Sequence, residues 1–280
     1  MIKIKNMKRY FLYTLLGAMM VTMASCDKID KDRYLVPSGQ TGEWFVSNKN
    51  ISKDQRAMVE KYTGVRCVNC PEADNVIHAS SERYGDKLVA VAIHSGNFGR
   101  PLGSDPDLRT ESGTVWYEHF VGTSAGLPAA MVNRGELFNP LAGVDDKIEA
   151  VISQSPKIVM DIENSGDKLI PIADIHVGFE QTVNEDLTLT LLLTEDNILT
   201  TQSRVGGDDI ENYAQNHVLR MVYTDVWGLP IEVSKEAGKK YFIRFYVTIP
   251  EGSVKENCHM VAFVSNKATR EILNVAQCNL

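Results

Sequence analysis

Two cysteines three residues apart are the part of the sequence best suited to carry out chemistry. Cys67 and Cys70 form a C-x-x-C motif with Val68 and Asn69 between them, and Pro71 follows directly. In such a pair one thiolate attacks a disulfide of a partner, and the second thiol then resolves the mixed disulfide. We therefore expect Cys67 to be the exposed, attacking cysteine and Cys70 to be the resolving one.

The motif lies between a predicted strand and a predicted helix. Residues 57–62 are expected to form the strand, and apolar positions spaced by three and four residues predict a helix over residues 72–84. Gly85 is a suitable helix end, and Pro71 suits the first turn, where its missing N–H costs little. The free N–H groups at a helix N-terminus stabilise a thiolate and lower its pKa. This placement favours redox chemistry.

The elements after the motif continue a recognisable order. A continuous apolar run over residues 88–93 predicts a buried parallel strand. Helices are expected around residues 107–120 and 141–153, with a strand between them that opens at Pro128 and has residues 135–138 as its candidate hairpin partner. This order resembles that of a thioredoxin-like fold, which we assign to residues 51–155.

The thioredoxin resemblance implies roles for two further residues. In that class the proline opening the strand is cis and faces the C-x-x-C motif, so the resemblance gives this role to Pro128. The backbone of Leu127 would then pair with a bound peptide. X-Pro bonds are cis in only about 5% of cases, so the expectation rests on the resemblance alone.

Two other interpretations of the cysteine pair stay open. C-x-x-C is also half of a zinc site, but a second such motif is missing and the six His are scattered. The pair could instead be a purely structural disulfide. The middle residues Val68 and Asn69 differ from the Gly-Pro of thioredoxins. Glu60 lies seven positions before Cys67. Thioredoxins have a buried acidic residue at a similar but not identical distance before their motif. Glu60 is therefore either a proton acceptor for Cys70 or simply a paired carboxylate.

A third cysteine belongs to the leader. Residues 1–25 run from a basic segment through an apolar stretch to Ala24 and Ser25, which is the order of a secretory signal peptide. The sequence Met23 to Cys26 resembles a bacterial lipoprotein processing site, which implies that Cys26 becomes the acylated N-terminus and anchors the chain to a membrane. The alternative is an ordinary cleaved signal followed by a chance cysteine.

Residues 26–50 are expected to be a tether. Mixed charges over residues 27–33 resemble a surface-export signal of some Gram-negative lipoproteins. The alternative is a solvated linker that carries no targeting signal. Residues 44–46 are apolar and are candidates to dock on the folded body.

The pattern changes at residue 156. Short, mostly alternating apolar segments predict an all-β domain over residues 156–280 that resembles an immunoglobulin-like or fibronectin-like sandwich. The expected strands lie at residues 158–162, 175–179, 187–191, 218–223, 243–249, 260–264 and 272–276. His176 and His259 fall on polar positions of these strands and are expected to be exposed or paired, without a metal.

The last two cysteines lie on the last two predicted strands. If the turn of this hairpin is centred on Ala268, Cys258 and Cys278 stand directly opposite each other. Opposed residues lie about 4.5–5.5 Å apart, which is within disulfide range. We therefore expect a cross-strand structural disulfide, and two separate thiols if the register differs.

Composition excludes several functions. The formal net charge is −7, and residues 1–26 hold Lys3, Lys5, Lys8 and Arg9 without an acid, so the rest of the chain carries −11. An acidic chain without a basic cluster is a poor candidate for binding nucleic acid. Serine-hydrolase, phosphate-loop and dinucleotide motifs are missing, and we expect no cofactor.

Three segments together resemble a known family, the Gram-negative outer membrane lipoproteins named after a 28-kilodalton outer membrane protein. They are Val59 to Gly64 leading into the C-x-x-C motif, His217 to Gly228, and Asn257 to Val264. The resemblance implies a thioredoxin-like domain followed by a β-sandwich on a lipid anchor in the outer membrane, facing the periplasm or the cell surface.

Two functions remain open at this point. The first is thiol–disulfide exchange on cell-envelope proteins through Cys67 and Cys70, with Pro128 shaping the peptide site. The second is a non-catalytic binding or structural lipoprotein in which the cysteines only stabilise the fold. Trp116, Tyr117 and Trp227 are candidate contacts for the second function and are equally good core residues.

Overall fold

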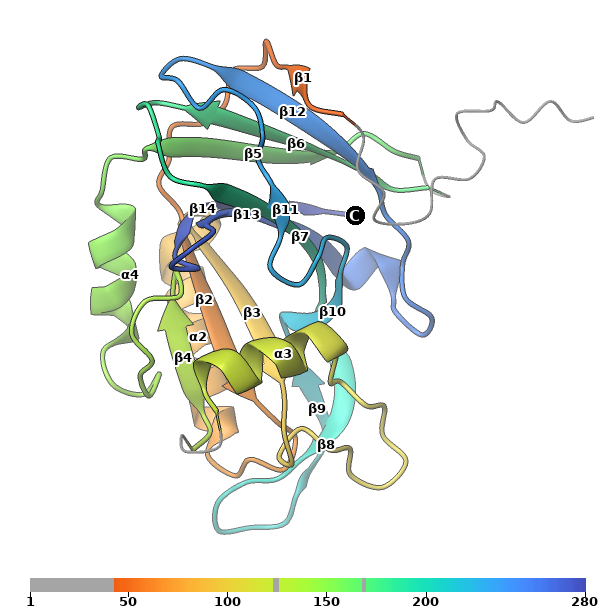
Figure 1. Ribbon diagram of the computed structural model, residues 1–280. Helices are drawn as coiled ribbons and strands as arrows, with labels where there is room; N and C mark the ends of the chain where they lie inside the picture. The colour runs from red at the N-terminus through yellow and green to blue at the C-terminus, as the bar shows by residue number, and fades with distance from the viewer. Residues whose placement is uncertain (1–42, 123–125, 168–169) are drawn as a thin grey trace, which may run out of the picture. The chain divides into compact units, whose positions relative to one another are not determined.

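The apolar run of residues 88–93 forms strand β3 (Leu88–His94) in the computed structural model (Figure 1). It pairs in parallel with β2 (Ala57–Thr63) along its whole length, and both strands are completely buried. Burial on both faces explains the continuous apolar run of β3, whereas β2 also buries two charged residues, Glu60 and Lys61, each in an ion pair. The prediction of both strands is confirmed.

The structure describes residues 43–122, 126–167 and 170–280. The signal peptide predicted over residues 1–25, the lipidation site Cys26 and the tether up to residue 42 lie outside the described residues. The class is mixed α/β, with several sheets and few helices.

Strands β2 and β3 belong to an eight-stranded sheet. Its strands in spatial order are β14 (Ile272–Asn279), β13 (Cys258–Asn266), β7 (Leu187–Glu195), β10 (Val218–Val222), β3, β2 and β4 (Ala129–Val132), with β11 (Leu229–Pro230) paired to β7. The β4 strand runs antiparallel to β2, and Ala130 forms a bridge with Phe138, so residues near 135–138 do pair with the proline-opened strand.

Helices cover both faces of the β2–β3–β4 part of this sheet. Helices α2 (Cys70–Tyr84) and α4 (Val144–Ile152) pack Ile77 and Ile148 against one face. Helix α3 (Glu111–Phe120) packs Trp116 against the other. The Thr110 hydroxyl accepts a hydrogen bond from the Gly113 amide and so caps α3. Within the described residues, two short 3-10 segments accompany these helices, η2 (Gly85–Lys87) and η3 (Lys255–Asn257).

A second, four-stranded antiparallel sheet packs against the other half of the large sheet. Its order is β1 (Phe45–Val46), β12 (Lys240–Tyr246), β6 (Ile172–Phe179) and β5 (Ile158–Asn164). Side chains such as Ile175 and Phe245 meet Leu191 and Met260 across the gap and form the largest core. Alternation along the strands produces this core, because every second side chain points inward.

Strands β7 and β13 connect the two halves of the fold. Leu191 and Ala262 face the four-stranded sheet, whereas Leu192 and Phe263 face the core that contains Trp116 of α3. The β10 strand completes the connection, because its Val218 pairs in parallel with Ala92 of β3. The large sheet therefore runs across residue 155, where the sequence changes its pattern.

The segment between β7 and β10 forms a hairpin that was not among the predicted strands. Strands β8 (Ile198–Gln202) and β9 (Ile210–Gln215) pair only with each other. The signal was present: residues 198–202 contain β-branched residues and residues 206–209 are Gly-Gly-Asp-Asp, a turn sequence. This hairpin lies beside the predicted redox site, as described below.

The predicted disulfide between Cys258 and Cys278 is wrong. Both cysteines are free, because Cys278 stands opposite Met260 while the Leu280 amide bonds to the Cys258 carbonyl. Ser265 pairs with Ile272, one residue beyond the Glu271 that a turn centred on Ala268 requires, and a register shift between Val264 and Ser265 moves the pairing by one residue more. Such a bulge places an extra residue on one strand and cannot be counted from the turn alone.

The apolar residues at the start of the described chain do dock on the body. Phe45 and Val46 form strand β1 on the edge of β12, and Trp44 packs against the large core. The Phe45 ring stacks on Phe242 with ring centroids 5.4 Å apart.

Candidate functional site

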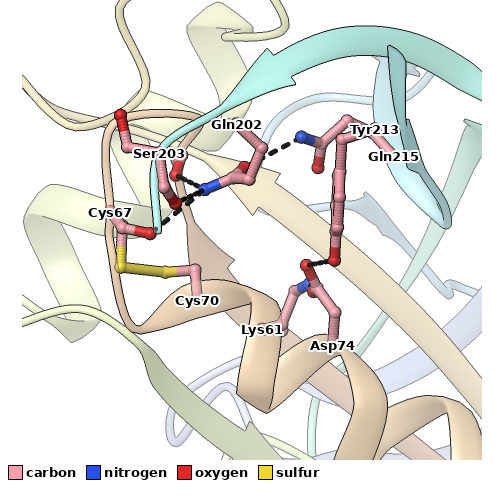
Figure 2. Close-up of a disulfide and its surroundings, with 9 residues drawn as sticks. Lys61, Cys67, Cys70, Asp74, Gln202, Ser203, Tyr213 and Gln215 are labelled. Atoms are coloured by element: carbon pink, nitrogen blue, oxygen red, sulfur yellow. Dashed lines mark hydrogen bonds and ion pairs between the residues drawn. A yellow bond between two sulfur atoms is a disulfide. The ribbon is translucent and has the colours of Figure 1, made fainter. Parts of the chain in front are cut away.

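Cys67 and Cys70 form a disulfide at the junction of β2 and α2, with Cα atoms 5.4 Å apart (Figure 2). Cys70 is the first residue of α2, and Pro71 occupies the first turn. The Cys67 amide bonds to the Gly64 carbonyl, and the Cys70 amide bonds to the Cys67 carbonyl. The two sulfurs therefore lie at the N-terminal end of the helix, as the sequence predicts.

Gly64 is required by the loop that holds the pair. A β-carbon at Gly64 would collide with the backbone of Phe98 and Gly99. The Arg66 amide also bonds to the Phe98 carbonyl, at 2.9 Å. The loop before the cysteines is thus fastened to the loop that follows β3.

The cysteines are not exposed as expected. Cys67 is 3% exposed and Cys70 is fully buried, whereas Val68 between them is 43% exposed. The expectation of an exposed attacking cysteine is therefore wrong for the oxidised form seen here. A thiol can approach the sulfur of Cys67 only if neighbouring groups move.

Pro128 lies at the same end of the sheet as the disulfide. Tyr62 near the end of β2 pairs with Ala129 at the start of β4, so the residue before Ala129 is next to the loop that leads to Cys67. The Leu127–Pro128 peptide bond is cis, as the thioredoxin resemblance implies.

Glu60 is a paired carboxylate. Both of its oxygens accept hydrogen bonds from the Arg134 guanidinium at 2.9–3.1 Å, and both side chains are almost fully buried. Because side chains alternate along β2, Glu60 points to the α3 face while Lys61 points to the α2 face. Glu60 therefore faces away from the helix that begins at Cys70.

Lys61 is the ionisable residue of β2 that faces α2. Its ammonium forms an ion pair with Asp74, which lies one helical turn after Cys70. Burial lowers the pKa of Lys61 to about 7. His94, at the end of the neighbouring strand, is also buried, and burial followed by the nearby Lys61 charge lowers its pKa to about 3, so this imidazole is neutral.

The β8–β9 hairpin completes the surroundings of the disulfide. The Gln202 amide donates to the carbonyls of Cys67 and Ser203, at 3.1 and 3.0 Å. The Tyr213 hydroxyl donates to Asp74 at 2.8 Å (Figure 2). A cavity of about 260 Å³ lies between this hairpin and α2, with Lys61 and Asp74 among its walls.

The sequence therefore identified the cysteines and missed their surroundings. Lys61 directly follows Glu60, which the sequence had suggested as a possible proton acceptor. Strand alternation could have indicated which of these two side chains faces α2. Gln202 and Tyr213 come from the missed hairpin, more than 130 residues after the motif. Nothing in the local sequence indicates that they reach it.

Other predicted residues lie away from the disulfide. Trp116 is completely buried and its indole donates to the Val226 carbonyl, so it is a core residue; Tyr117 and Trp227 pack partly buried against the same core. His259 is paired, as expected, and its hydrogen bond to Asp196 raises its pKa. His176 bonds to Ser47 through its Nδ1 atom.

Within the described residues, no cluster of three or more His, Cys, Asp or Glu is arranged to hold a metal ion. Among the helices that the structure describes, none is both long and apolar enough to cross a membrane.

The two cysteines that are free among the described residues allow a direct test of the disulfide assignment. We expect iodoacetamide to label Cys258 and Cys278 in the denatured, unreduced protein, and to label Cys67 and Cys70 only after reduction. In the native protein both free thiols should react slowly, because burial raises the pKa of each to about 12. Peptide mass mapping locates the labels; label on Cys67 without a reductant would contradict the assignment.

The fold and the disulfide define a mixed α/β protein that carries an oxidised C-x-x-C motif at a strand–helix junction. The sequence profile of the outer membrane protein family Omp28 matches residues 117–280, more than half of the chain. The chain belongs to this family, which confirms the family predicted from the sequence. The matched region begins after the C-x-x-C motif.

Solved structures share the fold at low sequence identity. HBP35 of Porphyromonas gingivalis has a TM-score of 0.64 and 18% identity, over 82% of this chain and 77% of that one. Protein AGR_C_4864 from Agrobacterium tumefaciens has a TM-score of 0.54 and 15% identity, over 81% and 96%. A domain of the outer membrane lipoprotein Omp28 from Porphyromonas gingivalis has 22% identity over 45% and 90%, with a TM-score of 0.31, too low for a structural argument. No curated protein matches the chain in sequence.

Proposed function

We propose that this Omp28-family protein is a lipid-anchored protein of the cell envelope that exchanges disulfides with other envelope proteins through Cys67 and Cys70. Cys26 carries the anchor, residues 51–155 form a thioredoxin-like domain, and residues 156–280 form an immunoglobulin-like sandwich. The observation that carries the exchange function is the position of the disulfide, which joins the first residue of α2 to the loop after β2.

The order and direction of the elements support the thioredoxin-like part. Strand β2, the motif, α2, the parallel strand β3, α3, the antiparallel strand β4 and α4 follow one another as predicted. The four-stranded sheet packed against β7 and β13 supports the sandwich. The two parts share one sheet through β10, so they would move as one body.

The exchange would proceed in two steps. In the reduced protein the Cys67 thiolate attacks one sulfur of a partner disulfide; a bond between Cys67 and the partner forms, and the other partner sulfur leaves and takes a proton. The Cys70 thiolate then attacks the Cys67 sulfur and releases the second partner sulfur as a thiol. Two electrons pass to the partner, and the product is the Cys67–Cys70 disulfide seen in Figure 2. A dithiol donor must reduce it again.

The 3% exposure of Cys67 favours a second candidate function. In this alternative the protein is a non-catalytic binding or structural lipoprotein, and the Cys67–Cys70 disulfide only stabilises the loop before α2. The two candidates differ in the reduction potential of the pair, because structural disulfides have potentials below roughly −300 mV whereas exchange proteins lie between about −270 and −120 mV.

A redox titration separates the candidates. We expect the pair to titrate with a midpoint in the range of exchange proteins, and the reduced protein to reduce a disulfide substrate such as insulin. Cys67→Ser should abolish this reduction, and Cys278→Ser, a matched change at a free cysteine, should leave it intact. A midpoint in the structural range together with no substrate reduction would favour the second candidate.

A further inference from the structure

A buried disulfide cannot exchange without a change in its surroundings. Attack on the Cys67 sulfur requires a partner sulfur in line with the Cys67–Cys70 bond, yet Cys67 is 3% exposed. This inference rests on the proposed exchange function and asks which part of the fold moves to admit the partner.

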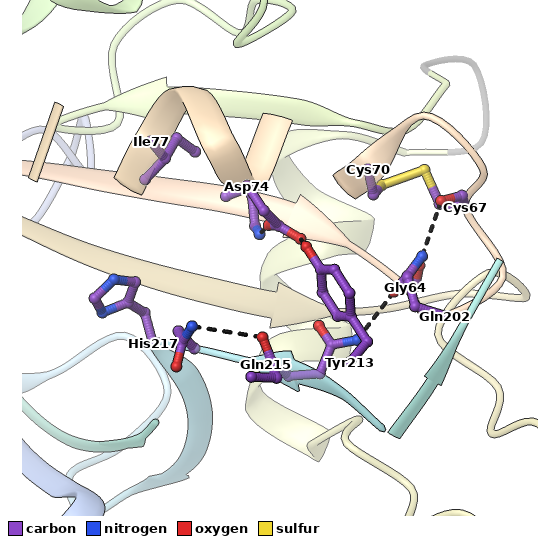
Figure 3. Close-up of polar contacts among 12 residues, drawn as sticks. Gly64, Cys67, Cys70, Asp74, Ile77, Gln202, Tyr213, Gln215 and His217 are labelled. Atoms are coloured by element: carbon purple, nitrogen blue, oxygen red, sulfur yellow. Dashed lines mark hydrogen bonds and ion pairs between the residues drawn. A yellow bond between two sulfur atoms is a disulfide. The ribbon is translucent and has the colours of Figure 1, made fainter. Parts of the chain in front are cut away.

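The β8–β9 hairpin is fastened to the loop that precedes the disulfide (Figure 3). The Ser203 amide donates to the Val65 carbonyl at 2.8 Å. The Gln202 side chain donates to the Cys67 carbonyl at 3.1 Å and reaches the Gly64 carbonyl at 3.4 Å. The end of β8 therefore holds the loop of Cys67 in its closed position.

The same hairpin is fastened to the helix on the other side of the disulfide. The Tyr213 hydroxyl of β9 donates to Asp74, one turn after Cys70. The two attachments are linked, because the Gln215 amide donates to the Gln202 side-chain oxygen at 2.9 Å (Figure 3). The hairpin thus bridges the two segments that the disulfide joins.

These attachments are polar, as is a hydrogen bond from the Thr201 amide to Asp105, and Ile198 is the one described residue of the hairpin that packs against a hydrophobic core. Leu199 is 57% exposed and Val205 is 67% exposed, and neither β8 nor β9 pairs with a strand of the two large sheets. Segments with few buried apolar contacts open at lower free energy than the core. The hairpin can therefore open while both large sheets stay folded.

We propose that the β8–β9 hairpin is a lid on the Cys67–Cys70 disulfide, held shut by Gln202 and Tyr213. When the lid opens, Gln202 leaves the Cys67 carbonyl and the hairpin separates from α2, so that a partner thiolate reaches the Cys67 sulfur. When it closes over the oxidised pair, it shields the disulfide from other thiols.

The rate at which dithiothreitol reduces the oxidised protein tests the lid. Gln202→Ala and Tyr213→Phe remove one attachment each, and we expect them to accelerate reduction by about fivefold and about tenfold. Gln55→Ala and Tyr223→Phe are controls that make the same substitutions elsewhere, because each removes a side-chain hydrogen bond to a backbone carbonyl outside the surroundings of Cys67 and Cys70. Both controls should stay within about twofold of the wild type. Unchanged rates in both hairpin variants would overturn the proposal.

Amide hydrogen exchange of the wild-type protein gives a second readout that does not depend on the variants folding. We expect the Ser203 amide to exchange by local opening, much faster than the amides of β3. Exchange of Ser203 only on global unfolding would contradict the lid. The lid and the exchange function can be rejected separately. Unchanged reduction rates, together with a reduction potential in the range of exchange proteins, reject only the lid. Faster reduction of the variants, together with a reduction potential in the range of structural disulfides, rejects only the exchange function.

Discussion

Arg134→Ala is expected to lower the free energy of unfolding by about 3–5 kcal/mol, because it leaves the Glu60 carboxylate buried and unpaired. The Arg134 and Glu60 side chains are 2% and 0% exposed and share three hydrogen bonds. The guanidinium also lies over the rings of Trp116, Phe120 and Phe263, at 4.7, 5.1 and 4.9 Å from their centroids. Alanine removes the charge and this packing together.

Urea unfolding measures the effect, and two comparisons separate its causes. Glu60→Leu combined with Arg134→Met removes both charges and keeps apolar volume, so this double variant should lose less stability than Arg134→Ala. Lys53→Ala breaks an exposed ion pair with Glu180 and should cost less than about 1 kcal/mol. If Arg134→Ala and Lys53→Ala lowered the free energy of unfolding equally, the buried Glu60–Arg134 pair would not have the predicted effect on stability.

The second large effect is a rise in stability with pH that depends on Lys61. An unfolded lysine keeps its proton up to about pH 10.4, whereas burial lowers the pKa of native Lys61 to about 7. Between these values the unfolded state binds more protons, so the free energy of unfolding should increase by about 1 kcal/mol per pH unit. Below pH 7 both states hold the proton and this contribution is constant.

Lys61→Met isolates this contribution. Cys258 and Cys278 act in the opposite direction above about pH 8.5, because burial raises their pKa values to about 12 and the native state then binds more protons than the unfolded one. The difference between wild type and Lys61→Met at each pH cancels that term. Denaturant unfolding from pH 6 to pH 10 should show the wild type gaining stability relative to the variant. Parallel pH profiles for the two proteins would disprove the assignment.

Local patterns were sufficient for most elements of the fold. The continuous apolar run of β3, the three-and-four spacing in α2 and the alternation of Leu and Thr at the start of β7 each report a side-chain pattern that depends only on neighbouring residues. The β8–β9 hairpin escaped because Leu199 and Val205 are exposed, so the segment lacks a regular buried face.

The cysteine hairpin shows a different limit. Its two strands were predicted, but the partner of Cys278 was not, because the shift between Val264 and Ser265 arises where β13 also pairs with β7. A strand with partners on both sides must satisfy two registers, and a turn specifies only one of them. This shift adds to a turn that already pairs Ser265 with Ile272 instead of Glu271, and together they place Cys278 opposite Met260.

The candidate site divides in the same way. The C-x-x-C motif, its place at a helix start and the family of the chain follow from residues that are close together in the sequence, since the chemistry of the pair depends on one loop and one helical turn. The partners of that motif come from distant segments: Arg134 reaches Glu60 across 74 positions, and Gln202 reaches Cys67 across 135. Only the tertiary structure could bring them together, because a sheet that continues through β10 into β7 and β13 places the β8–β9 hairpin beside the cysteines. The solvent exposure of Cys67 is therefore determined by the packing of these distant segments and not by the C-x-x-C motif itself.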